Sequence, residues 1–362
     1  MKRLIILTLS VLLNSVMLWA AAPFSFSFDE TTGEATLLSA NKSISKAVVI
    51  PDSVENEGKY YAVTKIAKQA FAKCGKVETV KLPSRLKAIG PTAFAECAKL
   101  KSIAIPEGVE VVPHHCFFLC TSLESATLPS TLKMIDHDAF IACRALQTIR
   151  IPKSVSHIKS WAFGENLALK SVVFEPGNTR LSIGDHAFDR SGLETLVIPS
   201  FVDSLGEYVF NGCSALKSAT IEANFDTLPK MTFHGCENMS ELSLKGTMNA
   251  IAYGAFSDCK KLASITLPAS LMEIGVNAFD GCNSLANINL QDLASLLTIR
   301  EAAFSGCESL TRVALPNGIK KIEDGTFMSC HSLIEITGEN VESEAEFSFY
   351  DCPNLKTKKF AK

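Results

Sequence analysis

Residues 262–282 read LASITLPASLMEIGVNAFDGC, and this pattern returns along most of the chain. Each copy contains one anchor phenylalanine, Phe279 in this segment, followed three residues later by a small residue that is usually cysteine. The thirteen anchors are Phe71, Phe94, Phe117, Phe140, Phe163, Phe188, Phe210, Phe233, Phe256, Phe279, Phe304, Phe327 and Phe349. Most anchors are 23 residues apart, and the exceptions are 22 or 25. Such a period is typical of stacked repeats.

The apolar columns of this unit predict short strands stacked around a common core. Ile265 and Leu267 are two residues apart, so they lie on one face of a short strand. Pro268 ends that strand, because proline has no N–H with which to extend a ladder. One unit cannot bury these residues alone, whereas stacked neighbours can. We therefore expect a repeat solenoid, a leucine-rich-repeat arc of about thirteen 22–25-residue coils with short parallel strands and short helical turns.

The residues before the first repeat predict export and an end cap. A basic start, an apolar run and three alanines ending at Ala22 are typical of a cleaved secretory signal. A retained membrane anchor is the less favoured alternative, because the run is short and interrupted by polar residues. The alternating phenylalanines and serines that follow are typical of a strand, and we expect this strand to cover the first coil. We divide the chain into a signal peptide (1–22), an N-terminal β cap and first strand (23–65), leucine-rich repeats (66–355) and a C-terminal tail (356–362).

The charge of the chain argues against a nucleic-acid partner. The formal net charge is −3, and loss of Lys2 and Arg3 with the signal peptide makes it −5. A mildly acidic chain lacks the basic surface that phosphate backbones require. No later segment has the length of apolar sequence that a membrane span needs. We therefore expect the mature protein to be secreted or to lie at the cell surface, with no membrane span after signal removal.

The cysteines follow the repeat and so predict buried thiols. Eleven of the twelve lie three residues after an anchor phenylalanine, and only Cys116 is out of this column. Asn166 and Ser191 take the same place in two coils, which predicts that residues in this column hydrogen-bond the turn backbone inside their own coil. A disulfide needs Cβ atoms about 3.8 Å apart, less than the roughly 4.8 Å between neighbouring coils. We favour free thiols, with some bridging as the alternative.

The sequence has no motif that indicates catalysis or a cofactor. The G-x-S-x-G, P-loop, H-E-x-x-H and G-x-G-x-x-G patterns are all absent. His114, His115 and Asp138 fall on neighbouring coils, but an exposed polar turn explains them better than a metal site. We therefore predict no enzyme activity, and we assign no catalytic, cofactor-binding or metal-binding residue.

One column of the repeats carries unusual side chains in five successive coils. Two residues before the anchor, successive coils carry His115, Asp138, Trp161, His186 and Tyr208. The same column tolerates Gln, Thr, Asn and Gly elsewhere, which predicts an exposed position. Aromatic side chains dominate binding hot spots. We therefore nominate these five residues as a ligand-binding stripe; the alternatives are that the rings only cover the turn, and that ligands use the charged strand face.

The unit L-x-x-I-x-[IL]-P-x-x-[LV]-x-x-I-x-x-x-A-F-x-x-C resembles the BspA-like (treponemal-type) leucine-rich repeats of surface proteins. The resemblance covers about residues 44–355. It implies a cell-surface or extracellular adhesion module that binds a protein, such as a host matrix protein or another cell surface. Two alternatives stay open: carbohydrate binding at the surface, and an architectural spacer in a surface assembly.

Overall fold

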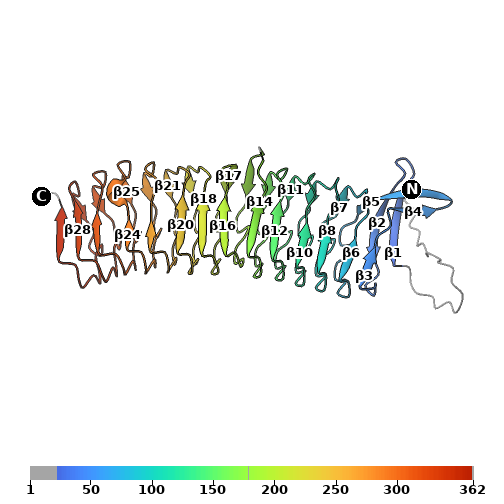
Figure 1. Cartoon of the computed structure of the whole chain (residues 1–362), viewed down its shortest axis with the longest axis horizontal. Helices are drawn as coiled ribbons and strands as arrows, with labels where there is room; N and C mark the ends of the chain where they lie inside the picture. The colour runs from blue at the N-terminus through green and yellow to red at the C-terminus, as the bar shows by residue number, and fades with distance from the viewer. Residues whose placement is uncertain (1–22, 178, 361–362) are drawn as a thin grey trace. The chain divides into compact units, whose positions relative to one another are not determined.

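The computed structural model describes residues 23–177 and 179–360, so the predicted signal peptide lies outside the described residues. The chain is a β-solenoid built from the expected coils, and it divides into two compact units, Met1–Thr179 and Arg180–Lys362. In each unit, successive coils place their short strands side by side (Figure 1). The predicted repeat solenoid with parallel strands is thus confirmed.

A small sheet covers the first coil of the first unit. Its strands are β1 (Phe24–Asp29), β2 (Glu34–Ala40), β4 (Ser53–Asn56) and β5 (Lys59–Ile66), in the order β1-β2-β5-β4. β1 and β2 form an antiparallel hairpin, as the alternating phenylalanines predict. The ring of Phe24 lies 6.1 Å from the ring of Phe71, so the hairpin covers the open end of the core.

The coils of the first unit carry two rows of parallel strands. The first row is β3 (Ala47–Val49), β6 (Thr79–Lys81), β8 (Ser102–Ala104), β10 (Ser125–Thr127), β12 (Thr148–Ile151) and β14 (Ser171–Phe174). The second row is β7 (Ala88–Ile89), which pairs with β5, then β9 (Val111–Val112), β11 (Met134–Ile135) and β13 (His157–Ile158). Partners in both rows are most often 23 residues apart, so the ladder follows the sequence period.

The second unit repeats this plan. Its first row is β16 (Thr195–Ile198), β18 (Ser218–Ile221), β20 (Glu241–Leu244), β22 (Ser264–Ile265), β24 (Asn287–Ile288), β26 (Arg312–Ala314), β28 (Glu335–Gly338) and β30 (Thr357–Phe360). Its second row is β15 (Leu181–Ile183), β17 (Val202–Leu205), β19 (Thr227–Leu228), β21 (Ala250–Ile251), β23 (Glu273–Ile274), β25 (Thr298–Ile299), β27 (Lys321–Ile322) and β29 (Ser343–Glu344). β30 pairs with β28, so residues 357–360, assigned to the tail from sequence, continue the solenoid.

The turns differ from the expected helical ones. The described residues contain a single helix, the 3-10 helix η1 (Leu290–Asp292). Around each anchor, the residues two before and two after have left-handed backbone in nearly every coil, as at His115 (φ 53°) and Leu119 (φ 55°). Alternate amides therefore point at the next coil: the Phe117 amide donates to the Ala139 carbonyl at 2.8 Å. Those amides are engaged between coils, so they cannot form the i to i−4 bonds of an α-helix.

The anchor phenylalanines form the core of each unit. Twelve of the thirteen are fully buried, and Phe349 in the last coil is half-buried. In the first unit, the rings of Phe71 and Phe94 stack with centroids 5.0 Å apart and planes 14° apart. In the second unit, Phe233 and Phe256 stack at 5.7 Å and 2°. Neighbouring coils thus share one continuous apolar column within each unit, which accounts for the strict period.

The cysteine column runs beside these rings as free thiols. Every thiol of the column after Cys74 donates to the carbonyl of an earlier anchor, for example Cys120 to Phe94 at 3.1 Å and Cys259 to Phe233 at 3.3 Å. The bond therefore joins two coils, whereas the sequence suggested a bond within one coil. Asn166 was expected to act in the same way, but its buried amide makes no hydrogen bond.

Candidate functional site: the left-handed turn row

The residues two before each anchor form a row on every coil, which we call the turn row. Their left-handed φ values include 56° at Asp138, 59° at Trp161 and 57° at Tyr208. Their amides are held in the ladder, as in the bond from Tyr208 to the Lys230 carbonyl at 2.9 Å. The backbone of the row is thereby rigid, and the side chains project from the turn.

The five nominated residues all lie in this row but are less exposed than the sequence suggested. His115, Asp138, Trp161, His186 and Tyr208 are each half-buried. The cause is contact between coils, because a side chain on one turn covers part of the next. The structure brings four of them together in two pairs, one in each unit, and Trp161 lies in the same row of the first unit.

In the first unit, the group contains His115 and Asp138. The His115 Nε2 atom lies 3.7 Å from an Asp138 carboxylate oxygen. The His115 ring also meets the ring of Phe118 edge to face, with centroids 5.3 Å apart. A shallow hollow of about 420 Å³ opens beside these rings, with Lys68 and Glu96 among its lining residues. This group offers a small surface of mixed polarity.

In the second unit, the group is built on a buried carboxylate. The rings of His186 and Tyr208 are stacked, with centroids 4.7 Å apart and planes 7° apart. The His186 Nδ1 atom lies 2.6 Å from an Asp189 carboxylate oxygen, and Asp189 is only 2% exposed. Asn211 donates to the other oxygen of Asp189 at 3.1 Å. This contact with a buried side chain fixes the orientation of the imidazole.

Two further residues extend this group, and sequence reasoning missed them. The Lys230 ammonium lies 5.4 Å from the ring centre of Tyr208 and 5.7 Å from that of Tyr253. A hydrogen bond with Tyr208 raises the pKa of Lys230. Lys230 and Tyr253 lie three residues before an anchor, one column away from the turn row. The sequence feature that could have identified them is the spacing of Tyr208, Lys230 and Tyr253, which are 22 and 23 residues apart.

We call His186, Tyr208, Lys230 and Tyr253 the aromatic row. Its members come from four successive coils of the second unit, so the solenoid sets their spacing. Tyr253 is 40% exposed, and its hydroxyl accepts a hydrogen bond from Asn277 at 3.5 Å. A cation close to two ring faces is a favourable arrangement. The chemistry available here is recognition by ring faces and by one positive charge.

The strand face, the competing surface, has charges that are largely paired within the protein. Lys46 and Lys101 both lie 3.2 Å from Glu78, and Lys217 lies 2.9 Å from Glu194. Exposed pairs of this kind contribute little to stability. These ion pairs instead join side chains of neighbouring coils, so we consider the charged strand face mainly structural.

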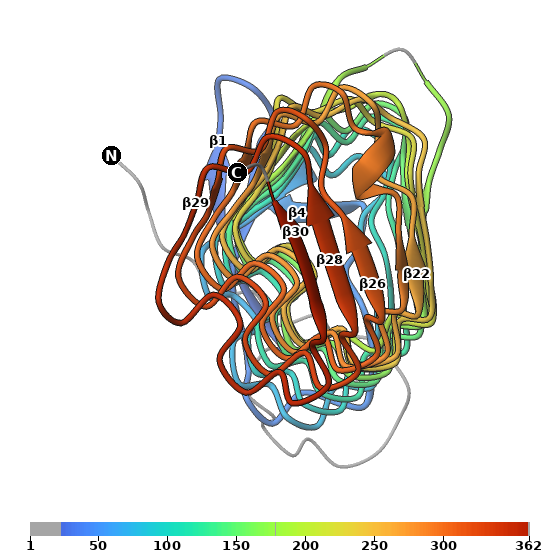
Figure 2. The ribbon, with the colours of Figure 1, turned by 90° about the vertical axis from the view of Figure 1, so that its left-hand side faces the viewer.

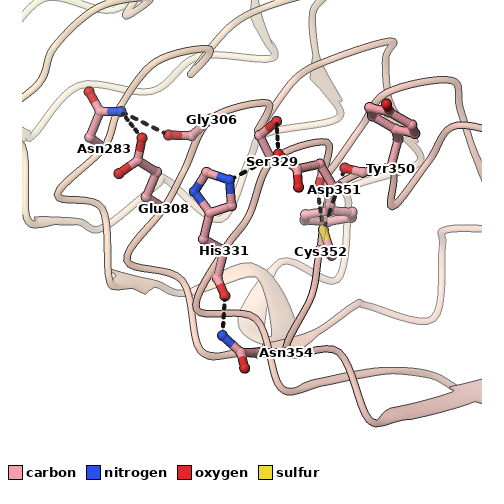
Figure 3. Close-up of polar contacts among 10 residues, drawn as sticks. Asn283, Gly306, Glu308, Ser329, His331, Tyr350, Asp351, Cys352 and Asn354 are labelled. Carbon is pink, nitrogen blue, oxygen red and sulfur yellow. Dashed lines mark hydrogen bonds and ion pairs between the residues drawn. The ribbon is translucent and has the colours of Figure 1, made fainter.

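A polar cluster occupies the last coils of the second unit (Figure 3). The His331 Nε2 atom lies 3.0 Å from an Asp351 carboxylate oxygen, and this hydrogen bond raises the pKa of His331. Cys352 lies beside the pair and is the one cysteine that is not fully buried. A hydrogen bond from the Cys330 thiol lowers the pKa of Cys352 to about 7. Among the residues described, no group of three or more histidine, cysteine or acidic side chains could hold a metal ion.

The family follows from a direct match to its sequence model. The BspA type leucine rich repeat region matches residues 43–170, 162–286 and 249–362. The chain therefore belongs to the BspA type leucine-rich-repeat family. No curated protein matches the chain.

Solved structures of bacterial repeat proteins are similar to this chain. A leucine rich cell surface protein from Faecalibacterium prausnitzii is 23% identical, with a TM-score of 0.57 and 96% of each chain covered. The pneumococcal vaccine antigen PcpA is 19% identical, with a TM-score of 0.50, 92% of this chain and 91% of that chain covered. These similarities support the fold. Within the described part of the chain, no helix has the length and apolar character to cross a membrane.

Proposed function

We propose that this chain is an extracellular or cell-surface module that binds a protein partner and has no enzyme activity. The observation that carries the proposal is the aromatic row, in which two tyrosine rings flank the ammonium of Lys230. Tyrosine is enriched in binding hot spots, because a rigid ring contributes a large contact area at low entropic cost. The family match and the description of the Faecalibacterium relative as a cell surface protein support the location.

Preorganisation favours this row over other parts of the surface. His186 is held by the buried Asp189, and the Tyr208 amide is held in the ladder. A partner therefore meets side chains that have already lost most of their freedom, which lowers the entropic cost of binding. The partner surface that fits best is acidic, because the positive charge of the row is the ammonium of the half-buried Lys230.

Glycan binding is the second candidate, because exposed tyrosine rings also stack on sugar rings. Tyr253 has the required exposure. An architectural spacer is the third candidate, and it requires no ligand on the row. One screen of the purified chain against immobilised matrix proteins and a glycan array separates the three candidates.

The test combines that screen with matched variants. For a matrix-protein hit, Tyr208→Ala with Tyr253→Ala is expected to weaken binding at least thirtyfold, the effect of losing about 2 kcal/mol at a hot spot. Tyr60→Ala is the control, since Tyr60 is 75% exposed and lies in the N-terminal cap. If a matrix protein binds the double variant as well as the parent, the aromatic row is not the site. A hit among glycans alone supports the second candidate, and no hit in either class supports the third.

A further inference from the structure

The first strand row of the second unit divides into three sheets, β16-β18-β20, β22-β24 and β26-β28-β30, and the second of its two breaks lies between β24 and β26. β24 belongs to a sheet with β22, whereas β26 is the edge strand of the sheet β26-β28-β30. The Ala286 amide donates to the Ala263 carbonyl at 2.9 Å, and the Ile334 amide donates to the Thr311 carbonyl at 2.8 Å. The corresponding bond from the Thr311 amide to the Ala286 carbonyl is absent among the described residues. The facing edges of β24 and β26 are therefore unpaired.

The break has a cause in the sequence. The coil from Phe279 to Phe304 is 25 residues long, and the 3-10 helix η1 lies within it, beside the end of β26 (Figure 2). The Asn289 side chain accepts a hydrogen bond from the Leu267 amide at 2.8 Å and donates to the Leu267 carbonyl at 3.1 Å. Asn289 is thereby held on the β22 side, which leaves β26 without its neighbour.

A groove of about 580 Å³ lies at this break and extends over the neighbouring strands, with lining residues from β22, β24, η1, β26 and β28. Its floor includes Ile265 and Ile288, and its walls include the exposed side chains of Asn287, Asp292 and Arg312. Arg312 lies 3.7 Å from Glu335, whereas Asp292 forms no ion pair within the described residues. The groove thus combines a free strand edge, an apolar floor and one unpaired carboxylate. None of its lining residues belongs to the aromatic row.

We propose that this groove binds an extended peptide segment that pairs with the free edge of β26 and places a basic side chain against Asp292. An exposed strand edge binds peptides through main-chain hydrogen bonds, while alternate side chains enter neighbouring pockets. The lining contains no aromatic residue on which a sugar ring would stack, so a peptide fits better than a glycan. The site is separate from the aromatic row, so either site can be tested without the other.

The test selects a random linear dodecapeptide library on the purified full chain and measures the affinity of the selected synthetic peptides. We expect peptides containing a lysine or arginine, with at least tenfold weaker binding to Asp292→Lys and to Thr266→Trp, which fills the groove. N-methylation along the peptide backbone should weaken binding at alternate residues, because a paired strand donates from every second amide. Asp292 and Thr266 are both exposed, so both variants should keep the thermal unfolding midpoint of the parent.

The control is Tyr208→Ala with Tyr253→Ala, which should bind the peptides as the parent does while losing any ligand of the aromatic row. The proposal is overturned if no enriched peptide loses affinity with both groove variants, or if the N-methyl scan shows no alternation. A glycan-array ligand that is lost with Asp292→Lys and Thr266→Trp would also overturn the peptide assignment. If Thr266→Trp fails to fold, Asp292→Lys and the N-methyl scan decide whether the peptides bind in the groove as a paired strand.

Discussion

The imidazole of His186 lies flat on the ring of Tyr208, with planes 7° apart and centroids separated by 4.7 Å. Both residues have left-handed backbone at the same position of successive coils. Neighbouring strands in a parallel ladder are about 4.8 Å apart, which is also a favourable distance between stacked rings. The repeat therefore stacks side chains on its turns without any additional element.

A comparison of Tyr208→Gly with Tyr208→Ala should separate the cost of backbone strain from the cost of losing the ring. Tyr208 has a φ of 57°, and a left-handed conformation costs a residue with a Cβ atom about 1 kcal/mol. We expect Tyr208→Gly to be about 1 kcal/mol more stable than Tyr208→Ala, because both lose the ring and only glycine relieves the strain. Urea unfolding of the two variants measures the difference. Equal stability would mean that this turn relaxes without cost.

Removing one anchor ring should strongly destabilise the second unit. Phe210 is fully buried between Phe188 and Phe233, with ring centroids 5.6 and 5.5 Å away. We expect Phe210→Ala to lower the free energy of unfolding by about 3–5 kcal/mol. Phe347→Ala is the matched control, since Phe347 is 48% exposed and should cost far less. Similar losses for both variants in denaturant unfolding would contradict the central role of the anchor column.

The thiol column should tolerate serine better than alanine. Cys259 donates to the Phe233 carbonyl at 3.3 Å, and serine keeps a donor there, although on a shorter bond. Alanine removes this donor and leaves the Phe233 carbonyl with the Cys236 amide as its remaining partner, at a cost of about 1 kcal/mol. We therefore expect Cys259→Ser to lie between the parent and Cys259→Ala in stability. A serine variant less stable than the alanine variant would show that the thiol contributes packing only.

Alkylation of the native protein should select a single cysteine. Burial raises the pKa of Cys97 and Cys213 to about 12, whereas the pKa of the half-buried Cys352 is lowered to about 7. Only thiolates react with iodoacetamide, so one label should enter quickly at pH 7.5 and peptide mapping should locate it on Cys352. After denaturation without reductant, all twelve cysteines should react. Fewer than twelve labels would reveal disulfides.

The last coils should become less stable as the pH rises above neutral. Asp351 raises the folded-state pKa of His331 above its ordinary value of about 6.5. The stabilisation is therefore fully present below about pH 6.5 and is lost as the pH rises through the raised value. The difference in stability between the parent and His331→Gln should be larger at about pH 5.5 than at about pH 8.5. Asp351→Asn should remove this pH dependence, and a difference that is constant across the range would rule out the pairing.

The sequence by itself determined the repeat, because only one set of apolar columns can be buried at a 23-residue period. The anchor Phe279, the strand pair Ile265 and Leu267 and the thiol Cys282 are all buried as their columns predict. Burial of the columns could not decide whether the turns are helical. Helical and left-handed turns bury the same columns, and the choice between them depends on where the backbone amides find acceptors.

Only the tertiary structure decided which side chains meet across coils. The sequence singled out His186 and Tyr208 but not Asp189, Lys230 or Tyr253, because these lie in other columns and meet the pair only when the coils stack. The groove at β26 depends on one absent hydrogen bond, from Thr311 to Ala286, which no pattern of side chains encodes directly. Burial acts on each column separately and can be read along the chain, whereas contacts between columns depend on the exact path of the neighbouring coil.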